Sequence, residues 1–170
     1  MHIRDAHAED WPHMWAFMRP VIEAGETYPY ERDRAENVVR EFWMNDSSPR
    51  ATLVSVTDDG AITGTAEIHP NQPGQGAHIA NAGFIVNAAY TGQGVGRALG
   101  NAVLERARSE GYHAMQFNAV VETNSHAVAL WHSLGFRTLA VVPDGFNHPT
   151  HGLVGMHIMY QKLTSSPEDA

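Results

Sequence analysis

Three glycines, Gly92, Gly94 and Gly96, alternate with other residues in the stretch TGQGVGRALG, directly before a segment with helical spacing of apolar side chains. The N-terminus of a helix exposes unpaired N–H groups and carries partial positive charge. A glycine-rich loop leading into it can surround a phosphate with main-chain donors, because glycine adds no side chain that blocks the approach. The alternative is a tight turn without a ligand, and the glycines alone do not decide between the two.

Two common phosphate-binding patterns do not fit this stretch. The dinucleotide pattern GxGxxG fails because Arg97 or Leu99 occupies the last glycine position, depending on which glycine begins the pattern. The P-loop pattern fails because no Lys-Ser or Lys-Thr pair follows. A pyrophosphate bound here would therefore belong to a different kind of fold.

The composition narrows the chemistry further. The chain has 170 residues, the length of one domain with a sizeable core. Eleven basic and nineteen acidic residues give a net charge of −8, which argues against a nucleic-acid partner and an anionic membrane surface. The lack of cysteine excludes thiolate catalysis and cysteine-based zinc sites, and the histidines form no HExxH pair. We therefore expect no metal site.

The N-terminal residues lack the basic and apolar regions of a signal peptide. No segment approaches the roughly 18 consecutive apolar residues of a membrane span. A soluble, cytoplasmic protein is therefore expected.

The glycine-rich loop needs a strand before it and a helix after it, and the spacing of apolar residues predicts both. We read residues 1–163 as one domain and residues 164–170 as a polar tail. Within the domain, strands are expected at 3–6, 51–56, 61–70, 78–86, 113–121, 137–143 and 155–163, and helices at 11–25, 38–43, 95–111 and 124–134.

At this point the sequence resembles a known superfamily. TGQGVGRALG, then a strand, then NSHAVALWHSLGF are similar to the two consecutive coenzyme A motifs of GNAT acetyltransferases. The resemblance implies an α/β (α+β) fold with a mixed, splayed central sheet of about six to seven strands and helices on both faces. It also implies that acetyl-CoA, the co-substrate, lies in the splay with its pyrophosphate on the loop. The residues implied to contact it are Phe84, Ile85, Val86, Gly92, Gln93, Gly94, Val95, Gly96, Arg97 and Asn124.

One position departs from the family pattern. Thr91 stands where Arg or Gln is usual, which removes one side-chain contact to the pyrophosphate and leaves the main-chain donors in place. Arg97 is a candidate to compensate for it.

A narrower resemblance concerns the acceptor. The segments NAGFIVNAAYTGQGVG, FNAVVETN, ETYP and VVP are similar to parts of fungal N-acetyltransferases that act on proline analogues such as azetidine-2-carboxylate and hydroxyproline. This resemblance implies that Asn81, Asn118 and Asn124 position the acceptor carboxylate, the amine and the thioester. An amide suits these tasks, because it can both donate and accept hydrogen bonds without charge. A small-molecule amine is thus the expected partner, and a homodimer is left open.

The resemblance leaves open which groups move the protons. Many GNAT enzymes place a tyrosine as general acid in the last helix, but the matching residue here is Trp131, which we interpret as a core aromatic. The base that deprotonates the amine is open among Glu67, His78 and Glu122, each on or just after a predicted strand.

The loop GETYPYE could cover the acceptor, with Tyr28 and Tyr30 as walls of its site, although such a loop can also be a simple turn. The main hypothesis is an acetyl-CoA-dependent N-acetyltransferase that acts on a small amine. The alternative is a catalytically silent acyl-CoA binding or sensing domain, motivated by Trp131 and Thr91.

Overall fold

The computed structural model describes residues 1–45 and 49–164, so the predicted polar tail lies, apart from its first residue, outside the described residues. The helices are α1 Trp11–Ala24, α2 Glu36–Trp43, α3 Val95–Ser109 and α4 Ser125–Ser133. The strands are β1 His2–Asp5, β2 Ala51–Val56, β3 Ile62–Pro70, β4 Ile79–Val86, β5 Ala114–Val121, β6 Arg137–His148 and β7 Gly152–Lys162. Short 3-10 helices span Ala8–Asp10, Gly74–Gly76 and Ala88–Tyr90.

All seven strands belong to one sheet in the order β1-β2-β3-β4-β5-β7-β6. Every neighbouring pair is antiparallel except β4 and β5, which are parallel and joined by α3. Such a parallel pair requires a crossover connection, which explains why a helix follows the glycine-rich loop. The mixed sheet predicted from the resemblance is confirmed.

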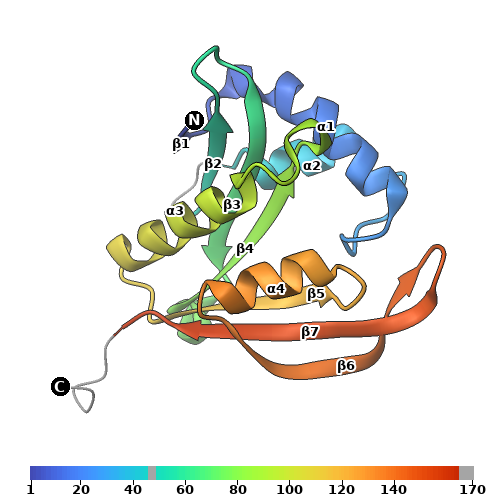
Figure 1. Ribbon diagram of the computed structural model, residues 1–170. Coiled ribbons are helices and arrows are strands. Elements are labelled where there is room, and N and C mark those ends of the chain that lie inside the picture. The colour runs from blue at the N-terminus through green and yellow to red at the C-terminus, as the bar shows by residue number, and fades with distance from the viewer. Residues whose placement is uncertain (46–48, 165–170) are drawn as a thin grey trace.

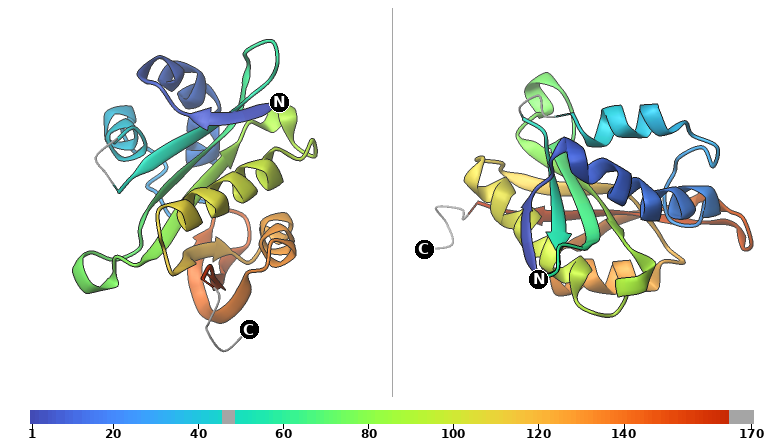
Figure 2. Two further views of the ribbon diagram at one scale, coloured as in Figure 1. Left: turned by 90° about the vertical axis from the view of Figure 1, so that its left-hand side faces the viewer. Right: turned by 90° about the horizontal axis from the view of Figure 1, so that it is seen from above.

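The helices cover both faces of the sheet (Figure 2, right). Residues of α1 and α2 form one apolar core against one face, and residues of α3 and α4 join the second core on the other. Side chains alternate between these faces along each strand. From Gly64 onward in β3, and throughout β4, odd-numbered residues therefore face the α1/α2 side, as Ile85 does, and even-numbered ones such as Ala66 face the α3/α4 side.

The sheet opens between β4 and β5. The two strands pair only at their first residues, Ile79 with Ala114 and Ala80 with Met115. Figure 1 shows the strands diverging beyond this point. We call this opening the splay. It leaves one edge of β4 without a partner strand from residue 81 onward.

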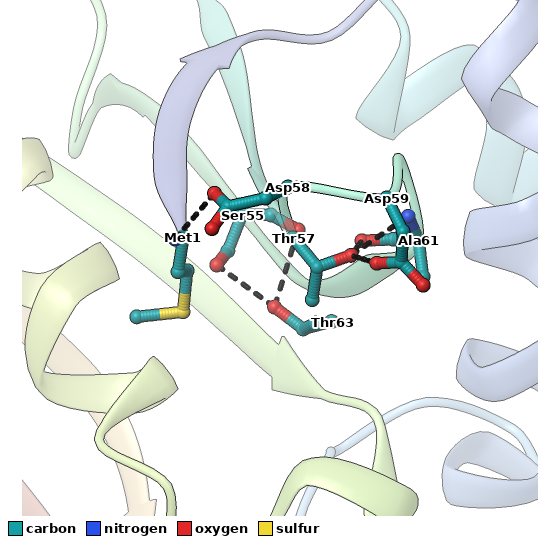
Figure 3. Close-up of polar contacts among 7 residues, drawn as sticks. All are labelled: Met1, Ser55, Thr57, Asp58, Asp59, Ala61 and Thr63. Atoms are coloured by element: carbon teal, nitrogen blue, oxygen red, sulfur yellow. Dashed lines mark hydrogen bonds and ion pairs between the residues drawn. The ribbon is translucent and has the colours of Figure 1, made fainter.

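The β2–β3 hairpin is held at its turn, as Figure 3 shows. Thr57 bonds the Asp59 side chain and accepts the N–H of Ala61 through its hydroxyl, and Gly60 has the positive φ of 90° that the predicted Asp-Gly turn requires. The N-terminal amine contacts Asp58 at 3.1 Å. These contacts fix the register of β3, and with it the face on which each of its polar residues lies.

Glycines in the left-handed conformation lie at the C-terminal ends of two helices. Gly25 ends α1 with a left-handed φ of 67°, and Gly135 follows α4 with a φ of 96°. The final hairpin is longer than predicted, because β6 continues past Pro143 to His148 through an irregular register that includes Asp144 at a φ of 54°. Among the described helices, none has the length and apolar character to cross a membrane.

Candidate functional site

The glycine-rich loop adopts the open shape that an anion cradle needs. Gly92 and Gly94 have φ values of 79° and 81°, a conformation that residues with side chains rarely adopt, and Gly94 is the N-cap of α3. A Cβ atom at either position would meet no other atom within 4 Å. The loop is therefore exposed at the N-terminus of α3, where main-chain N–H groups are available to a phosphate.

The third glycine has a different reason. A Cβ atom on Gly96 would lie 3.3 Å from a methyl group of Leu130 on α4, and one on Gly100 would lie 2.6 Å from Leu134. These two glycines thus allow α3 and α4 to pack closely. The three glycines look alike in the sequence, but Gly92 and Gly94 serve the turn and Gly96 serves the contact between two helices.

The side chains beside the loop are engaged with the protein. Arg97 donates from Nη2 to the hydroxyl of Ser133 on α4 at 2.9 Å, and it remains exposed. Gln93 donates to the carbonyl of Ala89 at 3.4 Å. Thr91 is exposed at the start of the loop. Arg97 therefore lies at the seam between the loop and α4.

Asn81 and Asn118 lie on opposite sides of the splay and on the same face of the sheet. Ala80 and Phe117 belong to the core on the α3/α4 side, so the residue after each of them points to the α1/α2 side. Asn81 pairs across the ladder with His69, whose ring packs edge-on against Phe42 of α2. The sequence pattern could not determine this shared face, because it depends on the register of three strands.

Asn118 belongs to a chain of amides. Its Nδ2 donates to Oδ1 of Asn71 at 2.6 Å, and its Oδ1 accepts from Gln116 at 2.8 Å. The register between β5 and β7 shifts between Phe117 and Val120, so Asn118 lies in an irregular part of the strand. Such bulges often redirect a side chain.

Asn124 is placed apart from these two. It is the N-cap of α4, and its Oδ1 accepts the N–H of Ala127 at 3.3 Å. This cap does not prevent its Nδ2 group from donating to a ligand. Asn124 thus lies at the end of β5, where α4 begins.

Glu67 is the buried carboxyl group of this region, with 6% of its surface exposed. It lies opposite Gly83 in the β3–β4 ladder, and a Cβ on Gly83 would meet Glu67 Oε1 at 2.8 Å and the Tyr28 hydroxyl at 3.0 Å. Burial raises the pKa of Glu67 to about 8, opposed by the charge of Arg50 and by the Gly83 main chain. The missing side chain at Gly83 gives this carboxyl its room.

His69 is the neighbour of Glu67 on the same face. Its Nε2 lies 3.6 Å from Glu67 Oε2, and its Nδ1 is 2.7 Å from the carbonyl of Pro70. Burial lowers the pKa of His69, so both members of this pair favour their neutral forms. The sequence carries a signal for His69: Glu67, His69 and Asn71 are spaced two residues apart, which places them on one face of a strand.

The two other base candidates lie elsewhere. His78 is exposed just before β4, with Nδ1 3.1 Å from the carbonyl of Gln75. Glu122 is exposed after β5, and its Oε2 accepts the N–H of Gly155 at 3.0 Å. Neither is buried beside the splay as Glu67 is.

The two tyrosines of the GETYPYE loop pack between α2 and β4. The Tyr28 hydroxyl accepts the N–H of Phe84 at 2.6 Å and donates to the carbonyl of the same residue at 3.0 Å. Tyr30 packs on Tyr28 at 5.2 Å between ring centroids, with the Arg34 guanidinium over its other side at 4.8 Å. Burial raises the pKa of Tyr28 well above its usual value, and Tyr30 and Glu67 add to the effect.

Trp131 lies in the core, as expected, with 6% of its surface exposed. Its ring centroid is 4.6 Å from that of Phe84, 4.8 Å from that of Phe117 and 6.1 Å from that of Phe136. This cluster fills the α3/α4 side of the sheet on both sides of the splay. Phe136, which follows α4, thus packs back on Trp131.

Together, five polar residues of β3, β4 and β5, with Asn71 directly after β3, share the α1/α2 side of the sheet around the splay. We call this set the polar face, and it comprises Glu67, His69, Asn71, Asn81, Gln116 and Asn118. A hollow of about 560 Å³ near α2 contains none of them, being lined by Ala6, Ala8, Asn37, Arg40, Glu41, Met44 and Asn45. We place the site by its chemistry, because reactive polar groups converge at the splay and not in that hollow.

Comparison with known proteins shows the family of this chain. Residues 4–136 match the model of the acetyltransferase (GNAT) family. The N-acetyltransferase aca1 of Schizosaccharomyces pombe is 32% identical over 168 residues, which cover 91% of this chain and 80% of that protein. A GCN5-related N-acetyltransferase from Kribbella flavida has a superposable structure, with a TM-score of 0.93, 50% identity and coverage of 95% of this chain and 97% of that one.

A more distant structure shares the fold alone. A GNAT superfamily phosphinothricin acetyltransferase from Sinorhizobium meliloti, determined in complex with acetyl-CoA, has a TM-score of 0.86 at 19% identity, covering 98% of this chain and 90% of that one. The family match covers β2 to β5, the glycine-rich loop and α4, and so includes the two strands that form the splay. This chain belongs to the GNAT acetyltransferase family.

Proposed function

We propose that this protein transfers the acetyl group of acetyl-CoA to the amine of a small amino or imino acid, such as a proline analogue. That it is an acetyl-CoA-dependent N-acetyltransferase follows from its family. The acceptor class is the new part of the proposal. The observation that carries it is the shared face of Asn81 and Asn118, on either side of the splay and beside the buried carboxyl of Glu67.

The residues present fit acetyl-CoA. The left-handed glycines leave space around the loop that a side chain would fill, and the N-terminus of α3 favours an anion. We assign the pyrophosphate to Gly92, Gln93, Gly94, Val95, Gly96 and Arg97, and the acyl arm to Phe84, Ile85, Val86 and Asn124. When bound, the thioester supplies an acetyl group that an amine can attack.

The polar face would hold the acceptor. Asn81 and Asn118 each present an amide that can bond a carboxylate through its N–H group or an amine through its oxygen. These amides are neutral, so they can bind a zwitterion at both ends without an added charge at either. We assign Tyr28 and Tyr30 to the wall of this site, since Tyr28 bonds the main chain of Phe84 at the open edge of β4 and Tyr30 packs on Tyr28.

Glu67 is the group that we assign to deprotonate the amine. An aliphatic amine with a pKa near roughly 10.4 is mostly protonated at neutral pH and must lose a proton before it attacks. A cationic amine beside Glu67 would favour the carboxylate form, which then accepts the proton. His69, 3.6 Å away and more exposed than Glu67, offers the proton a way to solvent.

The test of the acceptor class is the release of free coenzyme A thiol with paired amines. We expect turnover with azetidine-2-carboxylate, hydroxyproline or proline, and much weaker turnover with azetidine and pyrrolidine, which lack the carboxylate. Equal rates within each pair would show that no carboxylate is recognised. Binding of acetyl-CoA without thiol release for any amine would favour the sensing domain, the reading motivated by Trp131.

The test of the site residues is Asn118→Ala, with Asn101→Ala on the exposed side of α3 as the control. Loss of one oriented hydrogen bond should cost about 0.5–1.5 kcal/mol of transition-state stabilisation, more if the partner is charged. This cost should appear as a lower kcat/KM for the acceptor, with acetyl-CoA affinity unchanged. The Asn101 variant should match the wild type. A lower melting temperature with normal acceptor kinetics would show that the Asn71–Asn118–Gln116 chain is only structural.

A further inference from the structure

Asn71 lies between the two asparagines that the proposed function assigns to the acceptor. Its N–H donates to the carbonyl of Ile79 at 2.7 Å, so it extends the pairing of β3 with β4 by one residue. Asn81 follows two residues after Ile79 on the same face, which makes it the diagonal neighbour of Asn71. On the other side, Asn71 Oδ1 accepts a hydrogen bond of 2.6 Å from Nδ2 of Asn118. Asn71 therefore connects the β4 and β5 sides of the polar face.

The side-chain oxygens of these three asparagines already accept hydrogen bonds from the protein. Asn81 Oδ1 accepts the main-chain N–H of Ala82 at 2.8 Å. Because a main-chain nitrogen can only donate, this bond fixes which way the Asn81 amide points. Asn118 Oδ1 accepts from Gln116 at 2.8 Å, and Asn71 Oδ1 accepts from Asn118. At each asparagine, the oxygen is therefore the group that the protein itself uses.

The amide nitrogens of the three asparagines still have N–H groups to donate. Within residues 1–45 and 49–164, Nδ2 of Asn71 and Nδ2 of Asn81 donate no hydrogen bond, and Nδ2 of Asn118 uses one of its two hydrogens. An ionised carboxylate only accepts hydrogen bonds, through two oxygens. The donors that are left on this part of the polar face therefore match a carboxylate.

We propose that Asn71 is a specificity-determining residue of the acceptor site, whose Nδ2 group donates to the carboxylate of the acceptor beside Asn81. The inference rests on the proposed acceptor class, a small amino or imino acid. It adds a third amide to the pair of Asn81 and Asn118, and it gives Asn71 a contact with the ligand in addition to its bond with Asn118.

The order of residues along the strands agrees with this orientation of the acceptor. On β3, Glu67 precedes Asn71, and on β4, Phe84, which we assign to the acyl arm, follows Asn81. Because β3 and β4 are antiparallel, Glu67 and Phe84 lie toward the same end of the face. A carboxylate bound at Asn71 would therefore leave the amine directed toward the proposed base and the thioester.

The decisive variants are Asn71→Asp and Asn71→Ala. Asn71→Asp keeps an oxygen for the bond with Asn118 and replaces the N–H donor with a second acceptor, whereas Asn71→Ala removes both groups. Asn101→Asp, on the exposed side of α3, is the control for the added charge. The measurement is kcat/KM for azetidine-2-carboxylate divided by kcat/KM for azetidine, the same ring without the carboxylate. Damage to the base or to the fold affects both amines and cancels in this ratio.

We expect Asn71→Ala to lower the ratio by about tenfold, through loss of a hydrogen bond to a charged group. Asn71→Asp should lower it by about 100-fold, because one carboxylate would then face another. Asn101→Asp should leave the ratio unchanged. All three variants should bind acetyl-CoA in calorimetry as the wild type does, which shows that they are folded.

Two results would overturn the proposal and leave the acceptor class standing. The first is Asn71→Asp near the wild type with Asn71→Ala impaired, because only the oxygen that holds Asn118 would then matter. The second is an unchanged ratio in both variants. A wild-type ratio near one, or no turnover of azetidine-2-carboxylate by the wild type, would overturn the acceptor class and this inference together.

Discussion

The two ends of the candidate site are built in different ways. The glycine-rich loop consists of consecutive residues whose backbone conformations, with φ near 80° at Gly92 and Gly94, are required by the turn itself. The polar face collects single residues from three strands, and each is useful only because the register brings it beside the others. Under the proposed function, the ligand with the larger charge is bound by main-chain groups, and the acceptor by side chains.

Substitution of Trp131, in the core beneath both ends of the site, should have the largest effect. Trp131→Ala removes the ring that contacts Phe84, Phe117 and Phe136, and should reduce the free energy of unfolding by about 3–5 kcal/mol. Trp131→Phe should keep much of the activity, because Trp131 serves packing. Denaturant unfolding and steady-state kinetics measure the two effects. A stable Trp131→Phe protein without turnover would assign the indole a catalytic task.

Among the residues of the polar face, Glu67 should matter most for the acceptor kinetics. Glu67→Gln should lower kcat/KM for the acceptor by about 100-fold or more, the lower range of general acid–base catalysis. Because the pKa is about 8 and the carboxylate is the active form, wild-type kcat/KM should rise with pH through this region, and the variant should lack that rise. Tyr28, Tyr30, His69 and Arg50 also face this carboxyl, so the difference between the two profiles is the informative quantity.

The exposed Glu122 provides the control for that experiment. Glu122→Gln should leave the acceptor kinetics and their pH dependence close to those of the wild type, because its carboxyl bonds the Gly155 amide and lies outside the polar face. If Glu122→Gln, and not Glu67→Gln, abolished the rise with pH, the base would be Glu122, which follows β5, and not Glu67 on β3.

Burial of Glu67 should also appear in the stability of the protein. The folded state holds its proton up to about pH 8, while the unfolded chain releases it near the usual value of 4.5. The folded state therefore binds more protons between these values, and the free energy of unfolding should fall as the pH rises from about 4.5 to about 8. Urea titrations across this range should show a shallower decline in Glu67→Gln. Parallel curves for the two proteins would contradict a raised pKa.

At the glycine-rich loop, Gly94→Val should weaken acetyl-CoA binding by about tenfold or more. A side chain at a φ of 81° distorts the turn and enters the space assigned to the phosphate. Gly100→Val is the contrast, because a Cβ there would lie 2.6 Å from Leu134, so its main effect should be on stability. Calorimetry and thermal melting separate the two. Normal affinity in a folded Gly94→Val protein would refute the assignment of this loop.

Arg97 should give the smallest effect of the series. Its bond to Ser133 is exposed, and such contacts contribute little to stability. Arg97→Ala should therefore melt close to the wild type and weaken acetyl-CoA affinity by a few-fold, through the loss of one positive charge near the pyrophosphate. An affinity loss as large as that of Gly94→Val would mean that side chains, and not main-chain groups, contribute most of the binding energy at the glycine-rich loop.

The sequence by itself determined the features that depend on neighbours along the chain. The Asp59-Gly60 turn, the glycine at the end of α1 and the N-cap at Asn124 follow from local backbone preferences, which a linear sequence displays directly. The apolar spacing of Trp131 and its helix likewise predicted a buried face, and the coenzyme A motifs predicted the family.

Only the tertiary structure decided which distant residues meet. The choice of Glu67 over His78 and Glu122 rests on burial opposite Gly83, and the contact of Tyr28 with Phe84 joins residues 56 positions apart. The separate purposes of Gly94 and Gly96 also depend on where α4 packs. Burial, strand register and the packing distance between two helices arise from contacts between segments that are distant in the sequence. A local sequence pattern does not show which segments make these contacts.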